Sequence, residues 1–542
     1  MRYVYPKKII ACDGEVIGEN TLFNEKTLQI GLYEPKYALF KGKSGIILDF
    51  GAEISGGVRI LTYRFAGGRK VRLRFGESVG ETLAEIGEKN ATNDHAVRDF
   101  IVPLACLSDA TFGQTGFRFL RIDFLDDAET PVKAIVAACD ADERESRGSF
   151  TCDDELFNLI WQTAAYTVRL CLKNGYIWDG IKRDRLVWIG DIYTEVKTLR
   201  CLFGNAPEIK NSLVFCRDQT PDGRWMNDIP AYSGWWLYNL CEYYDTSGDD
   251  EFVKENIGFV NRIISDFSAC VAEDGTTNLP FNFIDWGSHY VDGDDKDKYY
   301  DEIAGTNYLL RTMMKNSIAL LDKFGEDSSL AKSVLSRLEK KSYKIRKYKQ
   351  IAAFACLSGE KNENNIEVIK RGGAKGLTTF LNYFIFKALA ENGEYAAAEA
   401  AIREYYGKML FLGATTFWED FDVDWFENAT RIDEIPVKGK LDPHGDCGRF
   451  CYKGYRHSLC HGWSSGVAAY MTEYIAGVRP SGENRDEFIF DPHLGTLNFV
   501  NAVYPTDKGD IEVTIKRLAD GKIEKTLTAP DGIKIRDSIH YR

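Results

Sequence analysis

The sequence predicts a multidomain α+β protein with an N-terminal β-sandwich, a central helical toroid and a small C-terminal β-sandwich domain. Alternating apolar and polar residues with Gly-rich turns fill roughly the first 148 residues, helical periodicity follows for about 320 residues, and strand patterns return at Gly477. A chain of 542 residues is long enough for several domains. We therefore expect domains at residues 1–148, 149–476 and 477–542.

The N-terminal region is predicted to be β because its apolar runs are short, alternating and separated by turn residues. The turn Ala66-Gly67-Gly68 lies between two such runs and predicts a hairpin. Together the runs fit a sandwich. The predicted strands are Gly45–Phe50, Gly57–Phe65, Lys70–Phe75, Asp99–Leu104, Phe117–Phe124 and Val132–Ala138.

The central region is predicted to be helical from Thr151, which with Asp154 resembles a helix-capping pair. Apolar residues then recur on one helical face, and helical runs pair off through short Gly-containing links. We expect ten to twelve helices, enough for a toroid of helical hairpins. The clearest are Tyr308–Phe324, Ser328–Tyr343, Leu377–Asn392, Glu394–Met409 and Ser464–Ala476.

The C-terminal region is predicted to hold short strands joined by the turns Asp520-Gly521 and Asp531-Gly532. The strands are Phe488–Phe490, Asn498–Val503, Asp510–Arg517 and Ile523–Ala529.

The charge and cysteine content narrow the classes of partner. A formal net charge of −13 repels phosphate backbones, so we expect no nucleic-acid partner. No apolar run reaches 18 residues and the N-terminus lacks the apolar stretch of a signal peptide, so we expect no membrane partner. The 13 cysteines are odd in number and without a Cys-x-x-Cys pair, which predicts reduced thiols, a cytoplasmic location and no structural zinc.

Three polar stretches are candidates for chemistry. Residues 178–191 hold three Asp, two Arg, one Lys and two Trp, and a helix over residues 184–191 would place Asp184, Trp188 and Asp191 near one face. Residues 413–422 contain Glu419 among aromatic side chains, and residues 456–466 contain His461. Acids, bases and aromatic rings on one surface suit a sugar pocket. Each stretch also fits a structural interpretation: a salt-bridged helix surface, a surface Glu or a histidine satisfied by the fold.

At these stretches the sequence resembles the α-L-rhamnosidases of glycoside hydrolase family 78. That family's Arg-(Asp)-Glu-Arg-Leu-Gly-Trp-Thr-Gly-Asp pattern, preceded by an Asp and a Cys-Pro stretch, corresponds to residues 179–191. Its Gly-Ala-Thr-Thr-x-Trp-Glu pattern is matched by residues 413–419, and its Asn/Cys-His region resembles residues 460–463. Residues 50–57 also look like the family's sandwich domain. The resemblance implies an (α/α)6 barrel between the two β domains.

The resemblance implies an inverting hydrolysis of terminal α-L-rhamnosyl residues from an oligosaccharide or glycoside. In that mechanism a carboxylic acid protonates the leaving oxygen and a carboxylate activates water, with the two groups roughly 6.5–9.5 Å apart. By position, Asp184 matches the general acid and Glu419 the general base. The matched sugar-binding positions are Asp179, Arg183, Trp188 and Asp191, with Trp236, Asp285, Trp286, Trp418 and His461 as further candidates.

The sequence departs from the family pattern at the acid, where Asp184 is one methylene shorter than the usual Glu. The Cys-Pro is Gly180-Ile181, and Val187 replaces the Gly before the Trp. Two other functions stay open: a toroid glycosidase or polysaccharide lyase acting on another sugar, and a non-catalytic sugar-binding protein. A homodimer is possible.

The predicted chemistry needs neither a cofactor nor a metal. The acidic stretch Asp292–Asp297 has the composition of a calcium loop but lacks the Glu at the twelfth position of an EF-hand, and we interpret it as a solvated loop.

Overall fold

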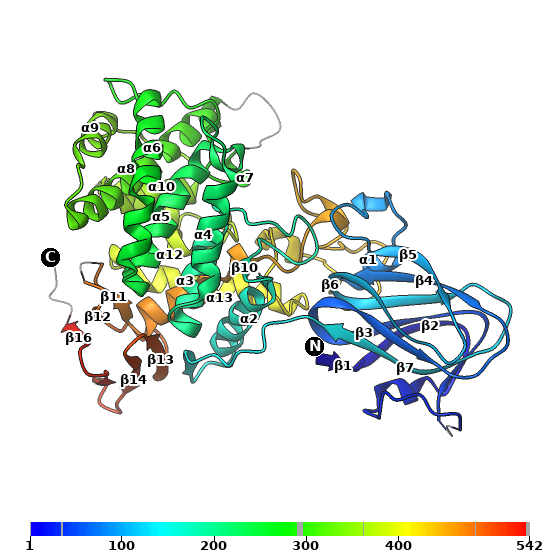
Figure 1. Cartoon of the computed structure of the whole chain (residues 1–542). Helices are drawn as coiled ribbons and strands as arrows, with labels where there is room; N and C mark the ends of the chain where they lie inside the picture. Colours follow the sequence, from blue (N-terminus) through cyan, green and yellow to red (C-terminus); the bar gives the residue numbers. More distant parts are fainter. Residues whose placement is uncertain (1, 34–35, 290–295, 361, 483, 538–542) are drawn as a thin grey trace.

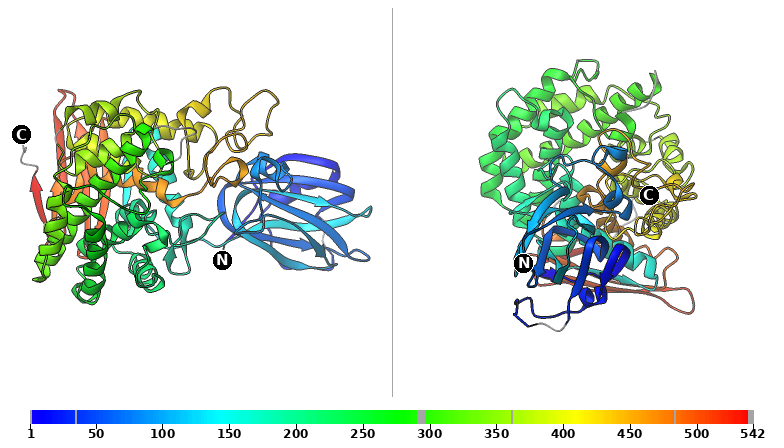
Figure 2. Two further views of the ribbon diagram at one scale, coloured as in Figure 1. Left: turned by 90° about the horizontal axis from the view of Figure 1, so that it is seen from above. Right: turned by 90° about the vertical axis from the view of Figure 1, so that its right-hand side faces the viewer.

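The computed structural model describes residues 2–33, 36–289, 296–360, 362–482 and 484–537. The fold is mixed α and β: a largely antiparallel sheet region is followed by a helical middle and by C-terminal strands (Figure 1). The N-terminal sheet region forms one lobe, and the helices and C-terminal strands form the other (Figure 2). The predicted domain limits stay a prediction.

The N-terminal lobe is a seven-stranded sheet with the order β1-β7-β3-β6-β4-β5, and β2 pairs with β3. Neighbouring strands are antiparallel except β3 and β7. Its core gathers the inward residues of alternating strands, among them Phe40, Leu48 and Phe117. The strands are β1 (Arg2–Val4), β2 (Lys8–Ile17), β3 (Ala38–Thr62), β4 (Arg69–Gly76), β5 (Asp99–Leu104), β6 (Asp109–Phe124) and β7 (Thr130–Cys139).

The predicted hairpin at residues 66–68 is wrong. The turn joins β3 to β4, but β6 lies between these two strands and pairs with both. Two of the predicted strands are also one, because β3 continues from Ala38 to Thr62 through bulges near Gly51 and Gly56. The chain does bend at residues 66–67, but strand pairing is decided by contacts with a strand that comes about 50 residues later in the chain.

The helical middle contains α2 to α14, and each predicted helix falls within or around one of them. Their bounds are α2 (Glu155–Cys171), α3 (Ile192–Phe203), α4 (Pro207–Gln219), α5 (Pro230–Ser247), α6 (Asp250–Cys270), α7 (Trp286–His289), α8 (Lys296–Phe324), α9 (Ser329–Leu338), α10 (Lys349–Leu357), α11 (Glu363–Lys370), α12 (Asn382–Glu391), α13 (Tyr395–Phe411) and α14 (Gly466–Tyr470).

Six of these helices contact one another in a closed series. Helix α3 packs on α5, α5 on α8, α8 on α10, α10 on α12, α12 on α14, and α14 again on α3. Large side chains such as Trp235, Tyr193 and Phe384 are buried among them. Asp191 is the N-cap of α3 and residues 378–380 precede α12, so the candidate site described below lies where these helices begin.

Helix α2 begins later than the capping pair predicted. Asp154 is its N-cap, and the carboxylate accepts a hydrogen bond from the backbone N–H of Leu156. Thr151 instead lies in β8 (Ser149–Cys152), which pairs with β13 (Phe499–Thr506). The start of the helical region is therefore joined to the C-terminal strands by a sheet.

The C-terminal strands form two sheets. One has the order β15-β14-β13-β8 and the other β11-β12-β16. The predicted turn at Asp520-Gly521 connects β14 to β15, and Gly521 has the positive φ of 84° that the turn requires. The remaining strands are β11 (Val478–Pro480), β12 (Glu487–Phe490), β14 (Gly509–Arg517), β15 (Ile523–Thr528) and β16 (Lys534–Asp537).

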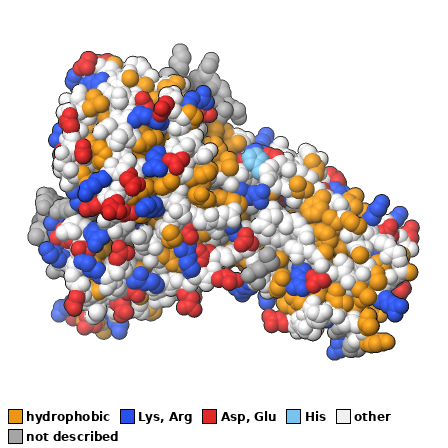
Figure 3. Space-filling view, viewed as in Figure 1, with side chains coloured by type: hydrophobic (Ala, Val, Ile, Leu, Met, Phe, Trp, Pro, Cys, Tyr) orange, Lys and Arg blue, Asp and Glu red, His pale blue; other side chains and the backbone are white. Residues whose placement is uncertain are grey.

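The surface shown in Figure 3 narrows between the two lobes and carries acidic and basic side chains side by side. Within the described residues, every helix is too short or too polar to cross a membrane. The acidic stretch considered as a calcium loop lies mostly outside the described residues, at 292–295.

Candidate active site

The stretch from Asp179 to Asp191 is a loop, so the helix considered for residues 184–191 is wrong. Helix α3 starts only at Ile192, and Asp184 and Arg185 have φ of 54° and 56°, the left-handed region that no helix interior uses. The loop is held by its own first residue, because the Asp179 carboxylate accepts the backbone N–H of Leu186 at 2.8 Å. The loop therefore presents consecutive side chains in different directions.

Arg183 connects the two predicted catalytic carboxylates. Its Nη1 lies 3.1 Å from Oδ1 of Asp184, while its Nη2 donates to Oε1 of Glu419. Burial alone would lower the pKa of Arg183, but the charges of Glu419 and Asp184 outweigh it and raise the pKa. One guanidinium thus brings together two acids that are 235 residues apart in the sequence.

Glu419 is buried and held at both its side chain and its backbone. The backbone N–H of Ser458 donates to Oε2 at 3.1 Å, and the Glu419 N–H donates to the Ser458 carbonyl at 2.9 Å. The indole N–H of Trp463 donates to the Glu419 carbonyl at 2.9 Å. The second and third polar stretches of the sequence therefore meet, and they fix the orientation of this carboxylate.

His461 lies beside the buried carboxylates of Asp179 and Glu419. Its Nε2 is 3.7 Å from Oδ2 of Asp179 and 3.9 Å from Oε1 of Glu419. Burial, and then the charge of Arg183, hold the pKa of His461 well below its ordinary value. The imidazole is therefore neutral near pH 7 and can either donate or accept a hydrogen bond.

Asp179 and Asp191, at the two ends of the loop, are both buried. Burial, and then the charges of Asp184 and Asp191, raise the pKa of Asp179 well above its usual range. Burial also raises the pKa of Asp191, although the Tyr232 hydroxyl donates to it at 2.6 Å. Both carboxyls are the kind of buried polar group that orients a neutral hydroxylated ligand.

The N-terminal lobe supplies one residue of the site. Nδ1 of His95 lies 3.1 Å from Oδ1 of Asp184 and accepts the backbone N–H of Asp184 at 3.0 Å. Arg185 donates to the His95 carbonyl at 3.0 Å, so the two segments hold each other. The acid position is thus built from both lobes.

A buried lysine joins the same loop to the N-terminal lobe. Nζ of Lys182 lies 3.2 Å from Glu77, 2.9 Å from Glu81 and 3.4 Å from Nε2 of His444. Ligand atoms of Glu77, Glu81 and His444 lie within 4.8 Å of one another, a spacing that a metal ion could use. Here the ammonium group provides the positive charge in their midst.

A cavity of about 780 Å³ opens beside Glu419 and is lined by Asp285, Asp420, Phe450, Tyr452 and Trp463, among others. Burial raises the pKa of Asp285 to about 6. Burial, and then the charge of Asp285, raise the pKa of Asp420 to about 7. Neither Asp184 nor Arg183 lines this cavity, but Arg183 contacts both Asp184 and the lining residue Glu419.

The predicted tryptophans lie at different depths. Trp188 is half-buried against Tyr232, and Trp286 stacks on the cavity residue Phe450 with a centroid distance of 6.3 Å. Trp418 is fully buried between Phe421 and His457. Trp236 is also fully buried, and its indole N–H donates to the Leu213 carbonyl at 2.9 Å. Neither Trp418 nor Trp236 faces the cavity.

Three residues of the site escaped the sequence reasoning. His95 has no predicted site residue near it in the sequence, whereas Asp420 directly follows Glu419 and Glu195 follows Asp191 by one helical turn, so both carried a signal. Glu195 is fully buried, and burial raises its pKa well above the usual range. A Cβ on Gly462 would lie 2.0 Å from Oε2 of Glu195, so a larger residue beside His461 would require this buried carboxyl to move.

Comparison with known proteins finds relatives among the bacterial α-L-rhamnosidases. Residues 145–355 match the family model described as the bacterial alpha-L-rhamnosidase 6 hairpin glycosidase domain. An alpha-L-rhamnosidase of Alteromonas sp. (strain LOR) is 23% identical over 547 aligned positions, which cover 91% of this chain and 55% of the relative. The chain therefore resembles the family 78 bacterial α-L-rhamnosidases.

Solved structures establish the fold. The GH78 family rhamnosidase of Bacillus sp. GL1 superposes with a TM-score of 0.76 and 20% identity over 96% of this chain and 55% of that one. The Streptomyces avermitilis α-L-rhamnosidase complexed with L-rhamnose gives a TM-score of 0.72 and 15% identity over 99% of this chain and 50% of that one. The chain spans about half the length of these relatives.

Proposed function

We propose that this protein is an inverting glycoside hydrolase that removes terminal α-L-rhamnosyl residues from an oligosaccharide or glycoside. The observation that carries the proposal is the pairing of Asp184 and Glu419 through Arg183 beside a polar, aromatic-lined cavity. The likeness of the chain to α-L-rhamnosidases supports the choice of sugar. The closed series of helices from α3 to α14 supports an (α/α)6 barrel as the scaffold.

In the proposed reaction, Asp184 gives a proton to the glycosidic oxygen as the bond from the anomeric carbon to that oxygen breaks. Glu419 takes a proton from a water molecule, whose oxygen attacks the anomeric carbon from the opposite face. The product is β-L-rhamnose and the free aglycone hydroxyl. His95 supports the acid role by positioning Asp184, because its Nδ1 accepts the Asp184 backbone N–H and lies 3.1 Å from the carboxyl that must carry the proton.

Arg183 supports the base role because its positive charge lies beside the Glu419 carboxylate and pairs with the ionised form that a base requires. Its second contact, with Asp184, must loosen when the leaving group enters, and the partial exposure of Asp184 leaves room for this. The neutral His461 and the buried carboxyls Asp179 and Asp191 are suited to the sugar hydroxyls. We assign the apolar side of the 6-deoxy sugar to Trp188, which packs on Tyr232, and to Trp286, which stacks on the cavity residue Phe450.

The first experiment measures hydrolysis of an aryl α-L-rhamnoside and follows the released sugar by NMR. We expect β-L-rhamnose to appear before the anomers equilibrate, and kcat to fall by about 10²–10⁴ in Asp184→Asn and Glu419→Gln. Glu427→Gln is the matched control, because this glutamate is exposed and eight residues from the base. Retained configuration would contradict the inverting mechanism.

The same assay separates the two other functions. An unsaturated product that absorbs in the ultraviolet would identify a lyase, and calorimetric binding of L-rhamnose without turnover would identify a sugar-binding protein.

We also propose a cytoplasmic location, which is supported by the finding that all 13 cysteines are free thiols.

A further inference from the structure

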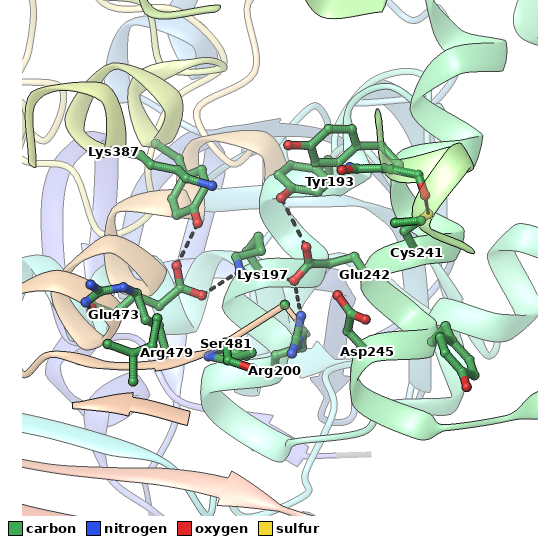
Figure 4. Close-up of a pocket in the computed structure, with 18 of the residues that line it drawn as sticks. Tyr193, Lys197, Arg200, Cys241, Glu242, Asp245, Lys387, Glu473, Arg479 and Ser481 are labelled. Atoms are coloured by element: carbon green, nitrogen blue, oxygen red, sulfur yellow. Dashed lines mark hydrogen bonds and ion pairs between the residues drawn. The ribbon is translucent and has the colours of Figure 1, made fainter. Parts of the chain in front are cut away.

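A second cavity, of about 750 Å³, lies at the other end of the helix series (Figure 4). Helix α12 relates the two cavities: Thr378, Thr379 and Phe380 precede its first residue and line the catalytic cavity, whereas Lys387 and Glu391 near its end line the second. Ten residues of helix at about 1.5 Å each span about 15 Å. The second cavity is therefore separate from the proposed catalytic chemistry.

The second cavity is polar because the ends of several helices meet there. Arg200 lies in the last turn of α3 and Lys323 in the last turn of α8, where the partial negative charge of helix C-termini favours cations. Tyrosine rings stand between the charged groups. The tyrosines are Tyr193, Tyr238, Tyr244, Tyr383 and Tyr474.

Some of these polar side chains already pair with one another, in two groups centred on Glu242 and Glu473. Glu242 receives Lys197 at 3.0 Å, a contact from Arg200 and the hydroxyl of Tyr193 at 3.2 Å. Glu473 receives Lys197 at 2.6 Å and the Tyr383 hydroxyl at 2.6 Å. These contacts, drawn as dashed lines in Figure 4, make a rigid floor whose charges are matched.

Other polar side chains that line the same cavity belong to neither of these two groups. Within the described chain, the Asp245 carboxylate and the Asn316 amide form no hydrogen bond or ion pair, and Lys323 contacts only the face of the Tyr244 ring, at 4.6 Å. Figure 4 shows Asp245 on α5 and Lys387 on α12 reaching in from different sides. Burial raises the pKa of Asp245, and the charges of Arg200, Lys323 and Lys197 offset only part of this rise. Donors and acceptors of both signs thus face one space without meeting.

From this arrangement we infer that the second cavity is a binding site for a neutral polyhydroxylated ligand, a monosaccharide or short oligosaccharide. Five cationic and four anionic side chains line it, so a small anion would gain little net attraction. A sugar hydroxyl both donates and accepts, which matches the unpaired Asp245, Asn316 and Lys323, while tyrosine faces suit its C–H surface. The volume lies in the usual range of about 300–1,000 Å³ for small-molecule sites.

This site is non-catalytic, since none of its residues belongs to the proposed catalytic pair or touches it. Its occupancy would fix the relative positions of α3, α5, α8 and α12 and thereby stabilise the folded protein by mass action. The inference is independent of the reaction proposed above, because it concerns binding at different residues.

The test is calorimetric titration of the whole chain with L-rhamnose and with D-glucose, combined with crystal soaks in the same sugars. We expect sugar density between Asp245 and Lys387, and a binding component that weakens at least about tenfold in Asp245→Leu. Asn316→Phe, which fills the cavity and leaves the ion pairs intact, should abolish that component. Activity on an aryl glycoside should be unchanged in both variants.

Glu251→Gln is the matched control, since it removes an exposed acid from the neighbouring helix α6 and should leave both binding components intact. Thermal unfolding of each variant checks that the fold persists. Empty density with both sugars, sugar binding unaffected by Asp245→Leu and Asn316→Phe, or binding of inorganic phosphate without sugar binding would each overturn the inference.

Discussion

Nδ1 of His95, on a loop of the N-terminal lobe, lies 3.1 Å from Oδ1 of Asp184, the proposed acid of the helical lobe. The same nitrogen accepts the Asp184 backbone N–H at 3.0 Å, which fixes a residue whose φ is 54°. A short acid in a left-handed backbone is therefore positioned by the N-terminal lobe. This contact gives the N-terminal lobe a role in the proposed chemistry.

Replacing His95 by Ala should lower kcat on an aryl α-L-rhamnoside by about tenfold with little change in KM. The reason is that positioning of a proton donor acts on the transition state more than on ground-state binding. His95→Gln should recover part of the loss, because its amide can hydrogen-bond to the same groups. The control is His493→Ala, since His493 stacks on Tyr395 far along the chain in the C-terminal region. An unchanged kcat in His95→Ala would refute the positioning role.

Replacing Arg183 by Met should reduce both stability and activity. The variant leaves the Glu419 carboxylate buried without its cation, and breaking a buried pair costs about 3–5 kcal/mol of unfolding free energy. We expect kcat to fall by at least about 10² as the base loses its orientation. Chemical unfolding and steady-state kinetics measure the two effects. Arg224→Met, at an exposed arginine, should change neither.

Replacing Lys182 by Met should destabilise the junction of the two lobes in a pH-dependent manner. Without the ammonium, Glu77 and Glu81 face each other while buried, which we expect to cost about 3–5 kcal/mol when both are charged. Burial already raises the pKa of Glu77 to about 7, so protonation should relieve the loss at pH 5 relative to pH 8. Unfolding by urea at both pH values measures this difference. An equal loss at both would show that repulsion between the carboxylates is not the cause, and the exposed Lys522→Met is the control.

The cavity acids should make stability fall as pH rises. Asp420 has a pKa of about 7 in the folded protein against about 3.9 when unfolded, so the folded state binds more protons between these values. Its contribution is complete below about pH 4 and is lost as the pH rises through 7. Asp420→Asn stays neutral and should remove this part of the slope.

Unfolding free energies of wild type and Asp420→Asn at several pH values between 4 and 8 test the sign. Asp285, with a pKa of about 6, should act in the same direction over a narrower range. Asp222→Asn, whose carboxylate is almost fully exposed, should leave the slope unchanged. A wild-type protein that gains stability relative to Asp420→Asn as pH rises would contradict the assignment.

The fold class and the position of most helices follow from the sequence because apolar periodicity is a local property. Strand pairing does not follow from the sequence in the same way. Strand β6 separates β3 from β4, and β8 pairs with β13, which lies more than 340 residues later in the chain. The spacing of polar residues at 184–191 fits a helix, whereas in the structure Asp184 adopts a left-handed conformation supported by His95.

Resemblance brought Asp184 and Glu419 forward, but only folding shows that Arg183 lies between them. Trp236 was a candidate for the sugar pocket, but it is buried in the core. The sequence does not separate these two roles, because an aromatic residue in a helix can pack in the core as readily as it can line a pocket. His95 and Lys182 depend on contacts between lobes, and no local pattern encodes these.

The closed series of helices has a consequence for how the chain acquires its structure. The contact of α14 with α3 joins residues that are more than 260 positions apart, and β13 must then add to β8. Neither contact can form on the ribosome until Gly466 and the residues after it have emerged, so earlier helices wait with their inner faces uncovered. Closure of the circle is then a late, slow event with high sequence separation. Shortening the chain from its C-terminal end should therefore leave an open, aggregation-prone arc of helices in place of a smaller folded protein.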